Sequence, residues 1–300
     1  MKIGFIGLGR MGYSMCLNLL EHKHKLVVYD VNKKPIQQLA RKGAIPAYNM
    51  EEVISKLPKQ KIVWLMIPAK FVDDTLKKLL PLLNKNDIVI DGGNSYYTDS
   101  IKRYNQLKKK GIKFLDCGTS GGIEGARYGA CMMVGGDKPV FKKVEKLFKD
   151  QCVERGYGYM GNPGAGHFVK MAHNAIEYGM MGAIAEGFKA IEKQVPKFKT
   201  NIKEVAKVYS HGSIIEGKLM GWLWHAFKKP GYLKQISCEV PKGETEEEMK
   251  MLEKMSNMPI LHQAHLMRER SRKMKVCGQL IAAMRNMFGG HAIIRKQEKR

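Results

Sequence analysis

Four polar side chains with complementary chemistry recur at helical spacing near the middle of the chain. Lys170, His173, Asn174 and Glu177 stand at positions i, i+3, i+4 and i+7, which share one face of a helix. Burial can lower the pKa of a lysine and raise that of a glutamate, so that such a pair can take a proton and return one. Lys170 and Glu177 are therefore the candidate catalytic residues. A solvated helix face with an unrelated mixture of charges is the plainer alternative.

The first thirty residues contain a dinucleotide-binding pattern in the context that it requires. Residues 2–6 resemble a buried strand, a glycine-rich turn and a helical stretch follow, and residues 26–30 resemble a second strand that ends in an acid. The turn supplies the candidate cofactor contacts Gly7, Leu8, Gly9, Arg10, Met11 and Gly12. In this motif the glycines allow a tight turn and bring a pyrophosphate close to a helix N-terminus. The sequence therefore predicts a nicotinamide dinucleotide as cofactor.

Asp30 indicates which dinucleotide is preferred. An acid at the end of the second strand accepts hydrogen bonds from the ribose hydroxyls and repels a 2′-phosphate. NAD is therefore the expected cofactor. NADP is the alternative, because Lys33 and Lys34 follow closely. A plain turn residue before Asn32 is the other interpretation of Asp30.

Apolar runs alternate with helical stretches up to about residue 160. The later runs occupy residues 61–67, 87–93, 113–116 and 131–136. This alternation predicts a doubly wound, Rossmann-type α/β domain with a mostly parallel sheet and helices on both faces. Ligands of such sheets bind at the carboxyl ends of the strands. Those positions here hold Ile67, Pro68, Asn94 and Ser120, of which the first three are expected cofactor contacts.

Helical periodicity replaces this alternation in the second half of the chain. Helices are predicted over residues 165–193, 201–211, 213–228, 245–256 and 259–286, and Val195-Pro196 is expected to end the first. The predicted boundary gives a Rossmann domain of residues 1–163 and an all-α domain of residues 164–300 for substrate binding and dimerisation. Apolar helices such as residues 261–287 usually bury a second face, so a homodimer or larger homo-oligomer is expected.

Composition limits the classes of function. The formal net charge is +24, but apart from a short basic tail at residues 295–300 the cations are spread widely, which argues against nucleic acid as the main partner. No apolar run is long enough to span a bilayer, and no signal peptide is visible, so a cytoplasmic protein without a membrane partner is expected. Six cysteines lack any C-x-x-C or regular spacing, which predicts reduced thiols. No metal site is expected, because His262 and His265 lack a convincing third ligand.

Five motifs together resemble 6-phosphogluconate dehydrogenase in its short form. They occupy residues 7–12, 91–95, 118–127, 170–179 and 283–291 and occur in the order that the family has. The resemblance implies oxidation of C3 of 6-phosphogluconate by hydride transfer to a nicotinamide cofactor. Loss of CO2 from the 3-keto intermediate then gives ribulose 5-phosphate, a reaction of the pentose phosphate pathway and of gluconate utilisation.

The same resemblance implies roles for individual residues. Lys170 resembles the base that takes the C3 hydroxyl proton and then polarises the keto oxygen, and Glu177 resembles the acid that protonates C1 of the enediol. The implied substrate contacts are Asn94, Ser120, Gly121, Gly122, His173, Asn174 and Tyr178. Tyr178 resembles a phosphate contact. Arg285 and His291 resemble a pair that reaches a bound substrate from the neighbouring subunit.

Two segments depart from the family pattern. Glu216 stands where the family has a phosphate-binding arginine, and a carboxylate there would repel a phosphate dianion. Residues 241–247 lack the family's Lys/Arg-Trp-Thr sequence, although Lys242 and Thr245 lie in this segment. Phosphate could instead bind through Arg285, Lys218 or Lys242.

These departures leave other functions open. One is a β-hydroxyacid dehydrogenase for a non-phosphorylated sugar acid or a small 3-hydroxy acid. Another is a non-enzymatic protein that binds nucleic acid through its charge or acts as an inactive sensor. The Lys170 and Glu177 pair argues against the inactive sensor.

Overall fold

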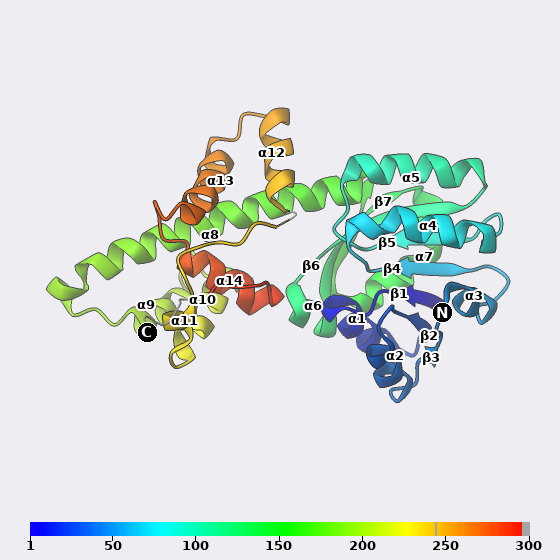
Figure 1. The fold of residues 1–300 in the computed structure, drawn as a ribbon, viewed down its shortest axis with the longest axis horizontal. Helices are drawn as coiled ribbons and strands as arrows, with labels where there is room; N and C mark the ends of the chain where they lie inside the picture. The colour runs from blue at the N-terminus through cyan, green and yellow to red at the C-terminus, as the bar shows by residue number, and fades with distance from the viewer. Residues whose placement is uncertain (244, 296–300) are drawn as a thin grey trace. The chain divides into compact units, whose positions relative to one another are not determined.

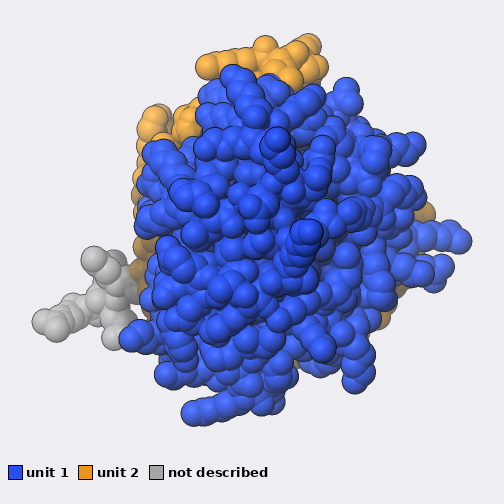
Figure 2. Space-filling view, turned by 90° about the vertical axis from the view of Figure 1, so that its right-hand side faces the viewer, with its two compact units in different colours: residues 1–170 blue, residues 171–300 orange. Residues whose placement is uncertain are grey.

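The structure is a computed structural model that describes residues 1–243 and 245–295. Residues 296–300, which make up most of the predicted basic tail, lie outside the described residues. Residues 1–170 and residues 171–300 form two compact units, which Figure 2 colours separately. None of the helices in the described residues combines the length and apolar character needed to cross a bilayer.

Eight strands form one sheet in the first unit, in the order β3-β2-β1-β4-β5-β6-β7-β8 (Figure 1). The strands are β1 Lys2–Ile6, β2 Lys25–Tyr29, β3 Ile45–Pro46, β4 Ile62–Leu65, β5 Ile88–Asp91, β6 Lys113–Ser120, β7 Ala130–Gly136 and β8 Cys152–Gly161. All neighbours are parallel except β6 and β7, which confirms the predicted Rossmann-type sheet. Strand β8 was not predicted, because its mostly exposed and partly exposed residues lack the apolar alternation of an inner strand.

Helices cover both faces of this sheet because successive strand residues point to opposite sides. Phe5 and Trp64 pack with the helices that follow β1, β2 and β7, whereas Ile6 and Leu65 pack with the helices that follow β3, β4 and β5. The helices are α1 Arg10–Glu21, α2 Lys33–Ala40, α3 Met50–Ser55, α4 Val72–Leu79, α5 Tyr97–Lys109, α6 Gly122–Tyr128 and α7 Lys138–Gln151, with 3-10 turns at Ala69–Phe71 and Leu80–Leu82. The rings of Phe5 and Trp64 are fully buried and stack with their centroids 6.0 Å apart. The packing on both faces holds the carboxyl ends of the strands in place, where a ligand can bind.

The second half of the chain is helical, as predicted. Its helices are α8 Ala165–Phe198, α9 Ile202–Tyr209, α10 Lys218–Lys228, α11 Tyr232–Gln235, α12 Thr245–Met255, α13 Pro259–Arg272 and α14 Gln279–Gly289. The prediction that Val195-Pro196 ends the first helix was wrong, because a proline in the last turn removes only one intrahelical hydrogen bond. The single helix predicted over residues 259–286 is two helices. The chain breaks between them at Met274, whose φ of 55° no α-helix accommodates.

A disulfide joins Cys238 to Cys277. The prediction that all six cysteines are reduced was therefore wrong for this pair. The two cysteines are 39 residues apart in the sequence, so no local pattern predicts that they pair. They meet because the chain returns through α12 and α13 to the start of α14. The other four cysteines are free. Burial raises the pKa of the Cys16 and Cys117 thiols, so these two are inert core residues.

Candidate active site

The turn between β1 and α1 has the shape that a pyrophosphate requires. Gly7 has a φ of +99°, and a Cβ atom there would lie 2.3 Å from the Met66 carbonyl oxygen. A Cβ atom at Gly12 would lie 2.0 Å from the Gly7 carbonyl oxygen, so only glycine lets α1 pack this close. At Gly9, the N-cap of α1, an added Cβ atom would meet nothing within 4 Å. This open space above a helix N-terminus fits the diphosphate of a dinucleotide.

Asp30 lies directly beside this turn. Its two carboxylate oxygens accept hydrogen bonds from the backbone N–H groups of Leu8, at 2.6 Å, and Asn32, at 2.8 Å. Asp30 therefore stabilises its own turn and also holds a negative charge next to the glycine-rich turn. Each carboxylate oxygen has a further lone pair for a ribose hydroxyl. Elsewhere in the turn, Leu8 is buried, Met11 is half-buried and Arg10 is exposed.

The segments after β4 and β5 lie side by side. A Cβ atom at Gly93 would lie 2.5 Å from the carbonyl oxygen of Ile67. The structure therefore brings Ile67 and Pro68 close to the segment that carries Asn94. All three stand at the carboxyl ends of their strands, where the sequence placed them as cofactor contacts.

Arg103 on α5 supports the segment that carries Asn94, and sequence reasoning missed it. It donates to the fully buried carboxylate of Asp91 at 3.2 Å, to the Ser95 hydroxyl at 3.1 Å and to Asp73 at 2.7 Å. The Ser95 hydroxyl in turn donates to Asp91 at 2.8 Å. Hydrogen bonding by the Arg103 guanidinium lowers the pKa of the Asp73 carboxyl. Because these charges are paired inside the fold, the segment between Asp91 and Ser95 is held in one conformation.

The N-terminus of α8, which carries Lys170, is fixed to β6. The buried Asp116 carboxylate accepts hydrogen bonds from the backbone N–H groups of Gly164, at 2.7 Å, and His167, at 2.9 Å. A carboxylate at this place satisfies free N–H groups and complements the helix dipole. The His167 ring is itself held by Ser100 at 2.7 Å. Asp116 was not singled out from the sequence.

Lys170 leaves α8 directly against strand β6. A Cβ atom at Gly118 would lie 2.3 Å from the Cβ atom of Lys170. Gly118 precedes Ser120 on the same strand, and the next residues, Gly121 and Gly122, begin α6. The first unit therefore brings Lys170 to the same end of β6 as Ser120 and the two glycines. Lys170 is half-buried, as a lysine that exchanges protons with a substrate must be.

The contact at Gly118 gives a test of this placement. Gly118→Ala should lower kcat by about tenfold or more and cost about 1–3 kcal/mol of stability, because the new methyl group must displace Lys170. Steady-state kinetics and urea unfolding measure the two effects. Gly187→Ala is the matched control, because nothing lies within 4 Å of its added Cβ atom. Gly43→Ala would not serve, because the backbone at Gly43 has a φ of +98°. Equal kinetics in the Gly118 and Gly187 variants would contradict the placement of Lys170.

In the second unit, α8 presents the rest of the polar face. The Nδ1 atom of His173 lies 3.7 Å from a Glu177 carboxylate oxygen. Asn174 is buried, and its amide donates to the buried Glu248 on α12 at 2.9 Å. Glu248 thus orients Asn174, and sequence reasoning missed it. Elsewhere on this helix Met171 is buried, whereas Ile176 is exposed.

Two arginines converge on Tyr178 in the second unit. The guanidinium carbon atoms of Arg268 and Arg285 lie 4.3 Å and 5.9 Å from the centre of the Tyr178 ring. The Tyr178 hydroxyl accepts a hydrogen bond from Thr245 at 3.0 Å, and Thr245 lies 3.4 Å from Arg268. Both guanidiniums also donate to the carbonyl oxygen of Pro241. We call Tyr178, Thr245, Arg268 and Arg285 the arginine cluster.

The charge of the arginine cluster is incompletely balanced. Arg268 and Arg285 are buried, and the Nε atom of each lacks a hydrogen-bond partner within the described residues. The nearby Glu246 carboxylate binds Arg272 at 2.7 Å and is 3.8 Å from Arg268. Burial lowers the pKa of Arg268, because desolvation disfavours the charged guanidinium. A phosphate bound at the cluster would balance this positive charge.

The other expected anion-binding residues lie elsewhere. Glu216 is exposed, and its carboxylate accepts a hydrogen bond from the Gly212 backbone at 2.5 Å, so it closes its own loop. Lys242 is exposed and pairs with Glu247 at 3.5 Å, and Lys218 is an exposed residue at the start of α10. His291 is exposed beside Phe288. Arg285 contacts Tyr178 of its own chain, whereas the family resemblance implies a role toward a neighbouring subunit.

A group of possible metal ligands also occurs in the second unit. Glu246, His265 and Glu269 bring one ligand atom each to within 4.8 Å of one another. His265 is buried and contacts Glu253 at 3.1 Å, whereas His262 is exposed. Because Arg272 already binds both oxygens of Glu246, we assign no metal to this group.

Comparison with known proteins gives a consistent result. Residues 2–161 match the model of the NAD binding domain of 6-phosphogluconate dehydrogenase, and residues 166–197 match the model of its C-terminal domain. The chain is 46% identical over 299 residues to a Bacillus subtilis protein named "Putative 6-phosphogluconate dehydrogenase YqeC", with 99% of this chain and 100% of the relative covered. It is 34% identical over 304 residues to the NAD(+)-dependent, decarboxylating 6-phosphogluconate dehydrogenase of Haloferax volcanii, with 99% and 100% covered.

Solved structures support the same grouping. The 6-phosphogluconate dehydrogenase of Plasmodium falciparum superposes with a TM-score of 0.83 at 28% identity, covering 92% of this chain. This chain spans 63% of the Plasmodium protein, so that protein has a large part without a counterpart here. A 3-hydroxyisobutyrate dehydrogenase of Mycobacterium tuberculosis, with a TM-score of 0.71 at 18% identity and coverage of 95% and 98%, shares the fold.

Proposed function

This chain belongs to the 6-phosphogluconate dehydrogenase family, and we propose that it converts 6-phosphogluconate to ribulose 5-phosphate and CO2 with NAD as the hydride acceptor. The observation that carries this proposal is the arginine cluster. Glu246, the carboxylate 3.8 Å from Arg268, already binds Arg272, so a non-phosphorylated acid would leave the two buried guanidiniums with positive charge in excess. The loss of the arginine at position 216 is thereby compensated by Arg268.

The first step needs a base at the C3 hydroxyl. In the proposal the side-chain amine of Lys170 takes the C3 hydroxyl proton. A dinucleotide held at the turn from Gly7 to Gly12 would supply the hydride acceptor for C3. Ser120 and Asn94 hydrogen-bond the sugar acid and orient it. The Asp116 carboxylate fixes the first turn of α8, so that Lys170 is positioned before substrate arrives.

The second step is decarboxylation of the resulting β-keto acid. The protonated Lys170 donates a hydrogen bond to the keto oxygen, which stabilises the negative charge that develops there as CO2 leaves. The enediol that remains needs a proton at C1. Glu177 supplies it, and His173, which lies 3.7 Å from Glu177, holds that carboxyl in place.

Asp30 should determine the choice of cofactor. We expect Asp30→Asn to move the ratio of kcat/KM for NADP and NAD toward NADP by about tenfold, because one like-charge repulsion with the 2′-phosphate disappears. Asparagine keeps an oxygen that can accept the Leu8 hydrogen bond, so the turn is preserved. Steady-state kinetics with both cofactors measure the ratio. An unchanged ratio would show that Asp30 serves only its own turn.

The experiment that tests the proposed reaction measures NADH formation and CO2 release together. The purified protein is given 6-phosphogluconate, D-gluconate or 3-hydroxyisobutyrate, each with NAD and with NADP. We expect both products from 6-phosphogluconate and NAD. NADH without CO2, or turnover of 3-hydroxyisobutyrate alone, would replace the proposal by a β-hydroxyacid dehydrogenase that shares the fold.

The proposal includes the setting of the enzyme. We place the reaction in the cytoplasm and assign it to a homodimer or larger homo-oligomer. Light scattering of the purified protein measures the mass of the assembly, and a mass of 34.0 kDa, that of one chain, would contradict an oligomer.

A further inference from the structure

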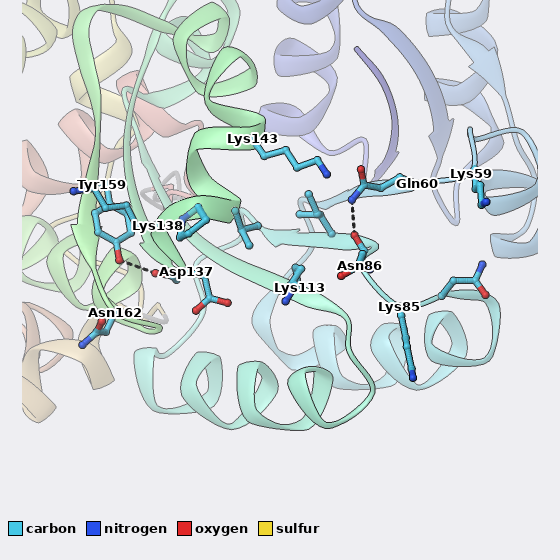
Figure 3. Close-up of a pocket in the computed structure, with 15 residues that line it drawn as sticks. Lys59, Gln60, Lys85, Asn86, Lys113, Asp137, Lys138, Lys143, Tyr159 and Asn162 are labelled. Atoms are coloured by element: carbon cyan, nitrogen blue, oxygen red, sulfur yellow. Dashed lines mark hydrogen bonds between the residues drawn. The ribbon is translucent and has the colours of Figure 1, made fainter.

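A cavity of about 920 Å³ opens in the first unit at the amino ends of two strands (Figure 3). Ile88 and Lys113, the first residues of β5 and β6, line it, together with the start of α7. Strands β1, β4, β5 and β6 run parallel, and the turn that begins at Gly7 follows the carboxyl end of β1. The cavity therefore lies at the opposite edge of the sheet from the cofactor turn and takes no part in the proposed reaction.

Five lysines surround this cavity. They are Lys59, Lys85, Lys113, Lys138 and Lys143. None of them has an ion-pair partner in residues 1–243 and 245–295, although their neighbours on α7 do: Lys142 binds Glu145 at 3.0 Å and Lys146 binds Asp150 at 2.8 Å. The one carboxylate in the lining is Asp137, which accepts a hydrogen bond from the Tyr104 hydroxyl at 2.7 Å. The lining thus has four positive charges in excess.

Neutral groups complete the lining. The amide of Gln60 donates to the carbonyl oxygen of Asn86 at 2.7 Å, which ties together the loops that carry Lys59 and Lys85. On the other wall, shown in Figure 3, the Tyr159 hydroxyl donates to the Gly136 carbonyl at 2.8 Å. Helix α7 begins at Lys138 and adds the positive end of its dipole to this wall. The loops that carry Lys59 and Lys85 form one wall, and the start of α7 with Tyr159 forms the other. Because both walls carry lysines, one ligand can contact cations on two sides.

We propose that this cavity binds a small molecule with two or more phosphate groups. Its volume lies in the range of small-ligand sites, of roughly 300–1,000 Å³. Lysine ammonium groups bind phosphates as point charges, and a bound polyanion relieves the repulsion among these five lysines. Nucleic acid is the other polyanion to consider. The lysines line a hollow to which Ile88 and Val140 add apolar groups, and a hollow of this size suits a compact ligand better than a duplex backbone.

Calorimetric titration of the full chain with inorganic tripolyphosphate tests this proposal. Saturating NADH is present throughout, so that the dinucleotide turn is occupied. We expect Lys113→Gln/Lys138→Gln to weaken tripolyphosphate binding by roughly tenfold at low salt, and added salt to reduce the difference. The control Lys42→Gln/Lys149→Gln removes two exposed lysines outside the lining and should bind as the wild type does.

A second variant guards against a folding defect. Lys59→Gln/Lys85→Gln changes only exposed loop residues of the other wall, and unchanged NADH affinity shows that the sheet is intact. Wild-type tripolyphosphate binding in both lining variants would overturn the proposal. Tighter binding of a short DNA duplex than of tripolyphosphate, lost in the same variants, would also overturn it and identify a nucleic-acid surface instead.

Discussion

Lys170→Met should lower kcat for 6-phosphogluconate by about 10²–10⁴-fold while NADH binding is unchanged. Methionine matches the apolar stem of lysine as far as Cε, so the contact with Gly118 survives and the ammonium group is lost. Without that group no base takes the C3 hydroxyl proton and no cation polarises the keto oxygen. Kinetics measure kcat, and quenching of protein fluorescence measures NADH affinity.

The exposed Lys189 provides the matched control. It lies on the same helix and pairs with Glu192 at 3.3 Å, so Lys189→Met should leave kcat within about twofold. Lys170→Arg adds a sharper comparison, because arginine keeps the positive charge but cannot act as a base at neutral pH. Near-normal turnover in Lys170→Arg would mean that Lys170 supplies only a positive charge and would contradict its role as the base.

Glu177→Gln separates the two halves of the reaction. If Glu177 acts only after CO2 has left, the first turnover should still produce NADH in a rapid burst, and the later turnovers should be slow. A stopped-flow record at 340 nm, the absorbance of NADH, measures both phases. Loss of the burst itself would place Glu177 in the hydride-transfer step.

The parts of this protein that were predictable from sequence are those in which neighbours in the chain are neighbours in space. The turn from Gly7 to Gly12 is a local motif, and its strand and helix carry their own periodicity. The polar face that starts at Lys170 follows from helical spacing alone. The strands at the sheet centre were found as apolar runs, because both of their faces are buried.

The parts that were missed depend on contacts between distant segments. Arg268 meets Tyr178 only because α13 packs beside α8, and nothing in the sequence around Arg268 distinguishes it from Arg270 or Arg272. Asp116 caps a helix that begins at Ala165, and Cys238 pairs with Cys277. The periodicity of neighbouring residues cannot predict any of these three contacts. The break near Met274 was missed although Gly278, a weak helix former, stands directly before α14.

Arg268→Met should raise the KM for 6-phosphogluconate by about 30–150-fold, which corresponds to the loss of roughly 2–3 kcal/mol from one charge-assisted contact with phosphate. The inhibition constant of D-gluconate, which lacks the phosphate, should change by less than about threefold. Methionine fills much of the same volume, and the Tyr178 ring keeps an apolar neighbour. Steady-state kinetics with gluconate as a competitive inhibitor give both constants.

Arg270→Met is the matched control for this prediction, because Arg270 lies on the same helix but is exposed. It should leave both constants unchanged. The comparison between two ligands separates phosphate binding from a general loss of structure, since unfolding or misplacement of α13 would weaken gluconate as much as 6-phosphogluconate. A parallel loss for both ligands would mean that the buried guanidinium only supports the helix packing, and that the phosphate is held by residues other than the arginine cluster.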